Sequence, residues 1–130
     1  IQTIILQMIE FIHAGYKVIV STHSPVLLEF VWAYNYLKSI PEGKRVGALC
    51  EVFGMQSSKK YNLNFLNDIY EKDIKTYYFS RDTSGKVKAK DISSLDVYSE
   101  DVAINEWGGL TQFSSKANEV VSKYMAQYGE

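Results

Sequence analysis

The stretch Val18-Ile19-Val20-Ser21-Thr22-His23-Ser24-Pro25 decides the fold that we expect for this chain. Three consecutive β-branched residues without polar alternation are typical of a strand buried on both faces, as in a parallel sheet. Ser24 is a favourable N-cap residue, and Pro25 suits the first position of a helix. We therefore predict a strand over residues 17–21, a short loop that carries His23, and a helix that begins at Pro25.

The residues before this stretch extend the pattern. Apolar residues recur at helical spacing through residues 1–13, and Gly15 stands where a left-handed C-cap is expected. A helix, a short turn and a strand in this order form the second half of a βαβ unit. Because the chain begins at Ile1 inside the helical pattern, we expect it to be a portion of a longer protein.

In the rest of the chain, the sequence pattern changes near Asp73 from helical periodicity to a run of strand-forming residues. Helical periodicity predicts helices over residues 25–38, 44–54, 61–70, 100–106 and 113–128. Within residues 74–92, strand-forming residues stand on both sides of a Gly-containing turn, which predicts a β-hairpin. In the final helix, the residues expected to face inward are Ala117, Val120, Val121 and Tyr124.

Composition limits the classes of function. The chain has 130 residues and is 46% hydrophobic, which is enough for a folded core. Cys50 is its single cysteine, so an internal disulfide is impossible and a cytoplasmic location is expected. No apolar run reaches the roughly 18–20 residues that span a bilayer, so we expect no membrane partner. A formal net charge of -1 argues against a broad electrostatic grip on nucleic acid.

His23 stands where a ligand is expected in an α/β protein. In open sheets, ligands bind beyond the carboxyl ends of parallel strands, and the N–H groups at a helix start favour anions. A histidine there can donate a hydrogen bond to a phosphate or orient an attacking water. The alternative stays open that Ser24 caps the helix and that His23 is a polar loop residue.

Together with Gly15, Lys17 and the helices on either side, the stretch from Val18 to Pro25 resembles the switch-histidine region of ABC-type ATPases. It is similar in particular to AAA-family P-loop ATPases of the OLD and AbiEii-like group, often found in bacterial phage-defence and toxin–antitoxin systems. The resemblance implies that His23 is the catalytic switch histidine, which contacts the γ-phosphate or the attacking water. The nucleotide-proximal residues that it implies are Ser21, Thr22 and Ser24.

The second half of the chain also resembles the C-terminal part of one bacterial subfamily of these proteins. The segments that carry this likeness are Lys72-Asp73-Ile74, Tyr77-Tyr78-Phe79, residues 86–93, Glu106-Trp107-Gly108-Gly109-Leu110 and Phe113-Ser114-Ser115. The resemblance implies an α/β fold class, with an incomplete P-loop ATPase (ABC-type) sheet portion followed by an α+β appendage with a β-hairpin. The implied domains are the end of the ATPase core over residues 1–40 and a helical and hairpin region over residues 41–130.

The sequence departs from the family where the nucleotide should be held. It contains no Gly-x-x-x-x-Gly-Lys-Ser/Thr phosphate loop (Walker A) and no apolar strand ending in Asp-Glu (Walker B). The resemblance therefore implies ATP and Mg²⁺ as cofactors of the full-length parent, and neither cofactor nor ATP hydrolysis for this chain by itself. The partners that it implies are the remainder of the ATPase chain, a second copy through the ATPase head, and an effector protein.

Other residues invite alternative functions. We interpret His13 as a cation that stabilises the C-terminus of the first helix. No CxxC or HxxxH spacing supports a metal site, so we predict none. No Gly-x-Ser-x-Gly elbow supports a serine hydrolase. We expect Trp107 to anchor the final helix by packing. The aromatic residues at 77–79 are assigned to sheet packing, and the lysines of residues 86–90 to a solvated edge.

Two alternative functions stay open beside the ATPase. The chain can be a non-catalytic interaction module of a defence or toxin–antitoxin system. It can also bind nucleic acid weakly through the hairpin at residues 81–90, which predicts an affinity that falls steeply with salt.

Overall fold

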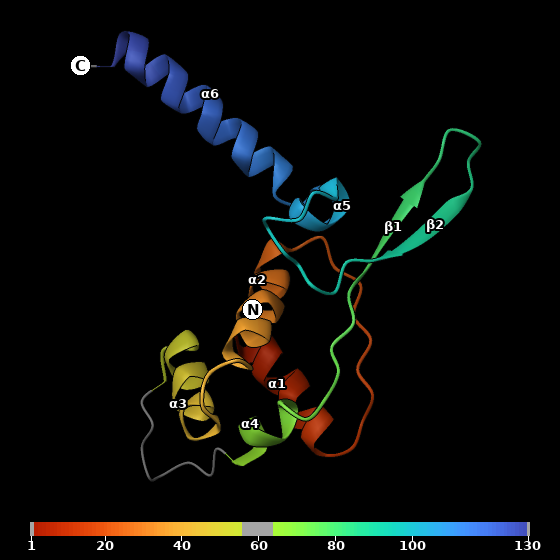
Figure 1. Ribbon diagram of the computed structural model, residues 1–130, viewed down its shortest axis with the longest axis vertical. Helices are drawn as coiled ribbons and strands as arrows, with labels where there is room; N and C mark the ends of the chain where they lie inside the picture. The colour runs from red at the N-terminus through yellow and green to blue at the C-terminus, as the bar shows by residue number, and fades with distance from the viewer. Residues whose placement is uncertain (1, 56–63, 130) are drawn as a thin grey trace. The chain divides into compact units, whose positions relative to one another are not determined.

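The computed structural model describes residues 2–55 and 64–129, which divide into two compact units (Figure 1). Unit 1 ends at Ile74, and unit 2 begins at Lys75. The elements of unit 1 are helices α1 (Gln2–His13), α2 (Pro25–Leu37), α3 (Glu42–Val52) and α4 (Asn64–Ile69). The elements of unit 2 are strands β1 (Tyr77–Arg81) and β2 (Val87–Asp91), helix α5 (Val102–Asn105), 3₁₀ helix η1 (Trp107–Gly109) and helix α6 (Gln112–Tyr128).

Helix α1 confirms the helical periodicity of the first residues and their glycine stop. Gly15 has a φ of 95°, and its N–H donates to the Ile12 carbonyl at 3.0 Å. The Tyr16 N–H donates to the Phe11 carbonyl at 3.0 Å, and the two rings meet edge to face. This is a Schellman cap with its hydrophobic contact, so the helix ends where the sequence predicts.

The strand predicted over residues 17–21 is absent. These residues have no regular secondary structure, and Ile19 is 96% exposed. Within the described ranges, the backbone of residues 17–23 makes no hydrogen bond, and β1 and β2 pair with each other alone. A β-branched run becomes a buried strand only where neighbouring strands supply ladder bonds, and no described segment supplies them. The incomplete ATPase sheet to which we assign this run stays a prediction.

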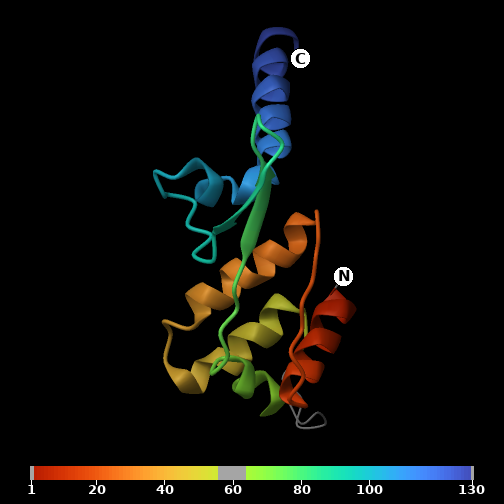
Figure 2. The ribbon, with the colours of Figure 1, turned by 90° about the vertical axis from the view of Figure 1, so that its right-hand side faces the viewer.

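The core of unit 1 lies between the described helices α1, α2, α3 and α4. Helix α1 packs on α4, and α3 contacts both α2 and α4 (Figure 2). The buried core side chains of this unit are Ile5, Ile9, Leu28, Phe30, Val31, Tyr34, Leu49, Cys50, Phe53, Leu66 and Ile69. Residues on both sides of the predicted boundary at residue 40 therefore share one core. The assignment of residues 1–40 to an ATPase parent stays a prediction.

Unit 2 contains the predicted hairpin. Strands β1 and β2 are antiparallel, with Tyr77 opposite Asp91 and Arg81 opposite Val87. In the turn, Asp82 Oδ1 accepts hydrogen bonds from the Ser84 N–H, the Ser84 hydroxyl and the Lys86 N–H. These bonds lower the pKa of the Asp82 carboxyl, the Ser84 hydroxyl contributing most. The polar turn therefore stabilises the hairpin that the sequence predicts.

Trp107 is buried, as its predicted packing role requires. Its indole N–H donates to the Leu95 carbonyl at 2.8 Å, and Leu95 is fully buried. Asp101 caps α5 by accepting from the Ala103 N–H at 3.0 Å, and its other oxygen pairs with Lys90 of the hairpin. These contacts tie the loop and α5 to η1 and β2.

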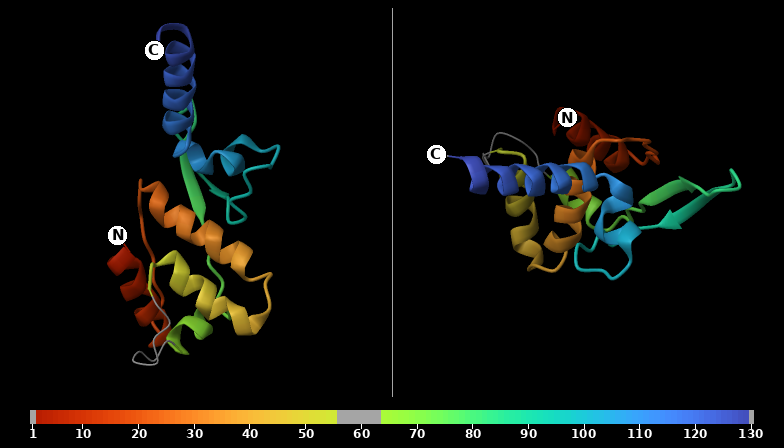
Figure 3. Two further views of the ribbon diagram at one scale, coloured as in Figure 1. Left: turned by 90° about the vertical axis from the view of Figure 1, so that its left-hand side faces the viewer. Right: turned by 90° about the horizontal axis from the view of Figure 1, so that it is seen from above.

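Helix α6 differs from the prediction in its burial. Its 17 residues include none that is buried, so the inward face predicted for Ala117, Val120, Val121 and Tyr124 is wrong. Both views of Figure 3 show α6, coloured blue next to the C-terminus, as a straight helix. The periodicity correctly predicts an apolar stripe, but no described element covers it.

Candidate functional site

The loop of residues 21–24 places His23 on the surface, directly before α2. His23 and Ser21 are exposed, whereas Thr22 and Ser24 are half-buried. The Ser24 N–H donates to Thr22 Oγ1 at 2.9 Å, which closes a short side-chain turn around His23. This bond fixes the backbone on both sides of the histidine while the imidazole stays accessible to solvent.

The N-terminus of α2 receives no side-chain cap. Ser24 occupies the N-cap position with an extended backbone, φ -85° and ψ 121°, but its hydroxyl makes no cap hydrogen bond. Pro25 has no N–H, so the first amide that α2 presents belongs to Val26. The helix dipole and these first-turn amides favour an anion beside His23. Ser24 does not cap the helix in the way that the alternative interpretation required.

The predicted site residues lie together because they are consecutive, and no other segment among the described residues joins them. In the part of the chain that the structure describes, the side chains of Ser21, Thr22, His23 and Ser24 have no hydrogen-bond or ionic partner outside this loop. The described residues also hold no group of three His, Cys, Asp or Glu side chains that could bind a metal ion. Burial raises the pKa of the Cys50 thiol above its usual value.

His13 has a partner that the sequence did not indicate. Its Nδ1 lies 2.7 Å from Asp68 Oδ2, and both side chains are about half exposed. The imidazole also lies near the Phe65 ring. The contact joins the end of α1 to α4 and supports the stabilising role predicted for His13. The partner lies 55 residues away, and no spacing pattern points to it.

A second cluster missed by sequence reasoning surrounds Tyr34. Its ring stacks on Tyr70 at a centroid distance of 5.2 Å, and Lys38 Nζ lies 4.8 Å from the centre of the Tyr34 ring. The Tyr70 hydroxyl donates to the Arg45 carbonyl at 3.3 Å. Burial raises the pKa of Tyr34, and the neighbouring Tyr70 and Asp73 raise it further. The cluster is enclosed and its polar atoms are paired, so its role is structural.

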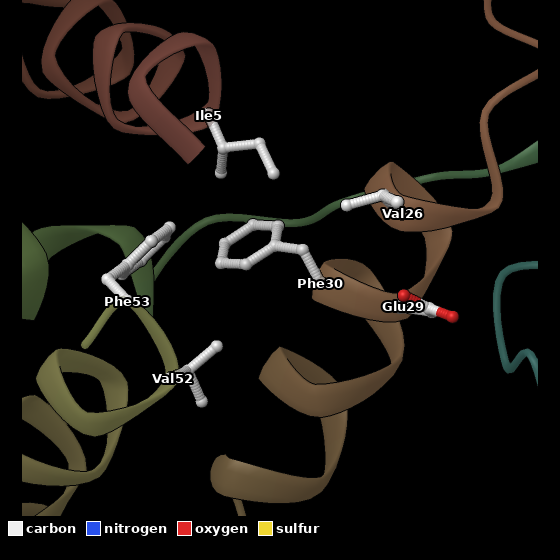
Figure 4. Close-up of a pocket in the computed structure, with 6 residues that line it drawn as sticks. All are labelled: Ile5, Val26, Glu29, Phe30, Val52 and Phe53. Carbon is white, nitrogen blue, oxygen red and sulfur yellow. The ribbon is translucent and has the colours of Figure 1, made fainter. Parts of the chain in front are cut away.

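The cavity in unit 1 does not suit a nucleotide. Figure 4 shows an apolar wall around Phe30, with Glu29 at its edge. Its volume is about 200 Å³, below the roughly 300–1,000 Å³ of typical ligand pockets. The lining residues are Ile5, Val26, Glu29, Phe30, Val52 and Phe53. None of them is a cation that would bind a phosphate.

The hairpin differs from the prediction in its aromatic residues and agrees with it in its lysines. Tyr77 and Phe79 are exposed, so the sheet packing assigned to them is wrong, whereas the ring of the half-buried Tyr78 lies against Gly108. Lys86, Lys88 and Lys90 are exposed on β2 and its turn, as predicted for a solvated edge. Lys90 is paired with Asp101, which reduces the positive charge that the hairpin offers to a nucleic acid.

The chain was compared with protein-family models, with curated proteins and with solved structures, and none of them matches. Among the helices of the described residues, none combines the length and the apolar character needed to cross a bilayer.

Proposed function

We propose that this chain is the C-terminal part of an ATP-binding and ATP-hydrolysing protein of the ABC-type AAA family, and that His23 is its γ-phosphate switch histidine. The observation that carries the proposal is the Val18–Pro25 sequence, whose histidine is exposed directly before an uncapped helix N-terminus. A phosphate at this place would meet an imidazole N–H donor and first-turn amides at once.

In this proposal the loop residues have separate tasks. His23 donates a hydrogen bond to a γ-phosphate oxygen or orients the water that attacks phosphorus. Thr22 holds the Ser24 N–H at 2.9 Å and so fixes the backbone on both sides of the imidazole. Ser21 and Ser24 lie beside the nucleotide. ATP and Mg²⁺ would be held by the rest of the parent protein, because this sequence has no phosphate loop and its described residues have no cluster of metal ligands.

The exposed run before the loop also supports the proposal. Ile19 is almost fully exposed, and the peptide groups on either side of it make no hydrogen bond to any other described residue. Neighbouring strands of an ATPase sheet would bury this side chain and pair these groups. Residues 17–21 would then be a strand that pairs with the sheet formed by the rest of the parent protein. A homodimer through the ATPase head and an effector protein are the further partners of this proposal.

The test is His23→Ala in the full-length parent. We expect ATP turnover to fall about 10²-fold or more, the usual effect of losing one group that stabilises charge in the transition state. The matched control is His13→Ala, which removes the other histidine and should leave turnover within about twofold. Unchanged turnover in a folded His23→Ala parent would contradict the proposal.

A second measurement concerns the chain by itself. Residues 1–130 should show no ATP hydrolysis above background, because the phosphate loop and the metal-binding carboxylates are missing. Turnover by the purified chain that disappears in His23→Ala would overturn this part of the proposal.

The exposed stripe on α6 favours one other candidate, a non-catalytic interaction module. In that case His23→Ala in the parent would leave both fold and turnover unchanged, and substitutions on α6 would abolish complex formation. The two candidates are thus separated by the same pair of histidine variants.

A further inference from the structure

Helix α6 exposes a continuous apolar stripe. Its members recur at separations of three, four and one residues, which places them on one face of the helix. They are Phe113, Ala117, Val120, Val121, Tyr124 and Tyr128. The terminal rings are the most exposed, Phe113 at 83% and Tyr128 at 78%. Contiguous exposed apolar side chains of this kind are typical of a contact surface.

The spacing of the stripe residues along α6 is the same whether the helix is followed from its N-terminus or from its C-terminus. The midpoint between Val120 and Val121 lies equally far from Ala117 and Tyr124, and equally far from Phe113 and Tyr128. Two antiparallel copies aligned at this midpoint would therefore place each of the six stripe residues opposite another of the six. Val120 would face Val121, the small Ala117 would face the large Tyr124, and the two terminal rings would face each other.

We propose that α6 pairs with α6 of a second copy of this chain, antiparallel and with the two-fold axis between Val120 and Val121. This inference goes beyond the proposed ATPase function and does not depend on it. A two-fold contact of this kind uses the same surface on both copies, as most homodimers do. Alternating large and small residues across the seam also suits close helix packing.

The charges beside the stripe favour the antiparallel direction. Lys116, Glu119 and Lys123 lie along one flank. In an antiparallel pair like flanks face each other, so Glu119 of one copy lies within one residue, about 1.5 Å of helix rise, of Lys123 of the other. In a parallel pair this flank would instead face the uncharged Ser114 and Asn118.

The ion pair between Glu119 and Lys123 that the antiparallel arrangement would form is not made within a single chain. Glu119 contacts Lys116 at 3.2 Å, and Lys123 Nζ lies 5.5 Å from the centre of the Tyr124 ring. In the described ranges, Lys123 has no carboxylate partner. Antiparallel pairing would supply one to each copy, giving two equivalent ion pairs at the rim of the seam.

The first test measures the mass of the full chain by sedimentation or light scattering over roughly a hundredfold range of concentration. We expect a concentration-dependent dimer. Tyr124→Glu should raise the dimer Kd by more than about tenfold, because it buries a charge in the seam. Ser122→Glu, on the opposite side of α6, is the matched control and should leave the Kd within about twofold. Both residues are exposed in the single chain, and circular dichroism checks that the helix is kept.

A monomer at every concentration would overturn the proposal, as would a dimer that Tyr124→Glu does not weaken. The first of these outcomes would mean that α6 packs on its own chain or on another protein.

Charge reversal tests the partner and the direction together. Glu119→Lys and Lys123→Glu should each weaken the dimer several-fold, and the double variant should restore it. Phe113→Cys mixed with Tyr128→Cys should give an intermolecular disulfide under mild oxidation, whereas Phe113→Cys by itself should not. Cys50 is buried and does not compete. A disulfide between two Phe113→Cys chains, or a double variant no better than the single ones, would overturn the antiparallel arrangement.

Discussion

The hydroxyl of Tyr34 donates a hydrogen bond to the carbonyl oxygen of Ile69 at 2.6 Å, deep in the core of unit 1. The carbonyl of Lys72 lies within 2.9 Å of the same hydroxyl. Tyr34 is fully buried on α2, and Ile69 is the last residue of α4. One phenol O–H thus reaches carbonyl groups at the end of a short helix, and it joins α2 to α4 through two residues that are 35 positions apart in the chain.

Tyr34→Phe should destabilise unit 1 without changing its fold. The ring keeps its packing but its hydroxyl donor is lost, which should lower the free energy of unfolding by about 0.5–1.5 kcal/mol. The cost stays in this range because the Ile69 carbonyl keeps the Lys72 N–H and the Lys72 carbonyl keeps Lys38 Nζ as donors. Urea unfolding measures this difference. Tyr36→Phe is the matched control, because in the described structure the Tyr36 hydroxyl has no hydrogen-bond partner. Equal effects of the two variants would show that the Tyr34 hydroxyl contributes nothing.

The same residue should make stability fall at alkaline pH. Burial, followed by the nearby Tyr70 and Asp73, raises the pKa of Tyr34 above its ordinary value of 10.0. Above that ordinary value the unfolded chain releases this proton while the folded chain retains it. The contribution of Tyr34 is therefore complete below about pH 10 and is lost as the pH rises further.

The measurement is the free energy of unfolding from about pH 8 to about pH 11, in the wild type and in Tyr34→Phe. The wild type should lose more stability than the variant over the alkaline part of this range. Some loss should remain in the variant, because burial also raises the pKa of Tyr70 and of Cys50. Parallel curves for the two proteins would contradict the assignment to Tyr34.

Features of the fold with local causes were predictable from the sequence. The cap at Gly15 depends on residues within one helical turn, and the hairpin turn depends on Asp82 and Ser84, which are two residues apart. Each signal is complete within a few neighbouring positions. That is why α1 and the β1–β2 hairpin formed as expected.

Features that need a distant partner were not predictable. Residues 17–21 have the composition of a buried strand, but a strand also needs neighbours, and the described chain supplies none. The stripe on α6 shows the same limit, because periodicity identifies an apolar face without identifying what covers it. In the candidate site, the position of His23 before a helix was predictable from Ser24 and Pro25. Outside that loop, the bond between His13 and Asp68 was not predictable, because its two residues are 55 positions apart.

Gly108→Ala should damage unit 2 more than Gly109→Ala does. Both glycines have positive φ, 67° and 89°, so both variants lose about 1 kcal/mol through backbone strain. A Cβ on Gly108 would also lie 2.5 Å from the Tyr78 ring, whereas on Gly109 the nearest atom is 3.9 Å away. Overpacking of this kind costs a further 1–3 kcal/mol or so, about the range seen for inserted methyl groups in packed regions.

Hydrogen exchange of the hairpin amides measures this difference within unit 2. Adding Tyr78→Ala to Gly108→Ala should remove the steric part of the loss, so that the two substitutions are less than additive. Equal protection in the Gly108 and Gly109 variants would show that Tyr78 does not press on this turn.

Substitutions of two glycines in unit 1 should have effects of opposite sign. Gly47 lies inside α3 with no atom within 4 Å of an added Cβ, so Gly47→Ala should raise stability by about 0.5–1 kcal/mol through helix propensity. Gly15 has equally open space but a φ of 95°, so Gly15→Ala should lower stability by about 1 kcal/mol. Urea unfolding of both variants checks the signs. Because neither added methyl group meets another atom, a loss of stability in both would mean that backbone conformation does not decide these positions.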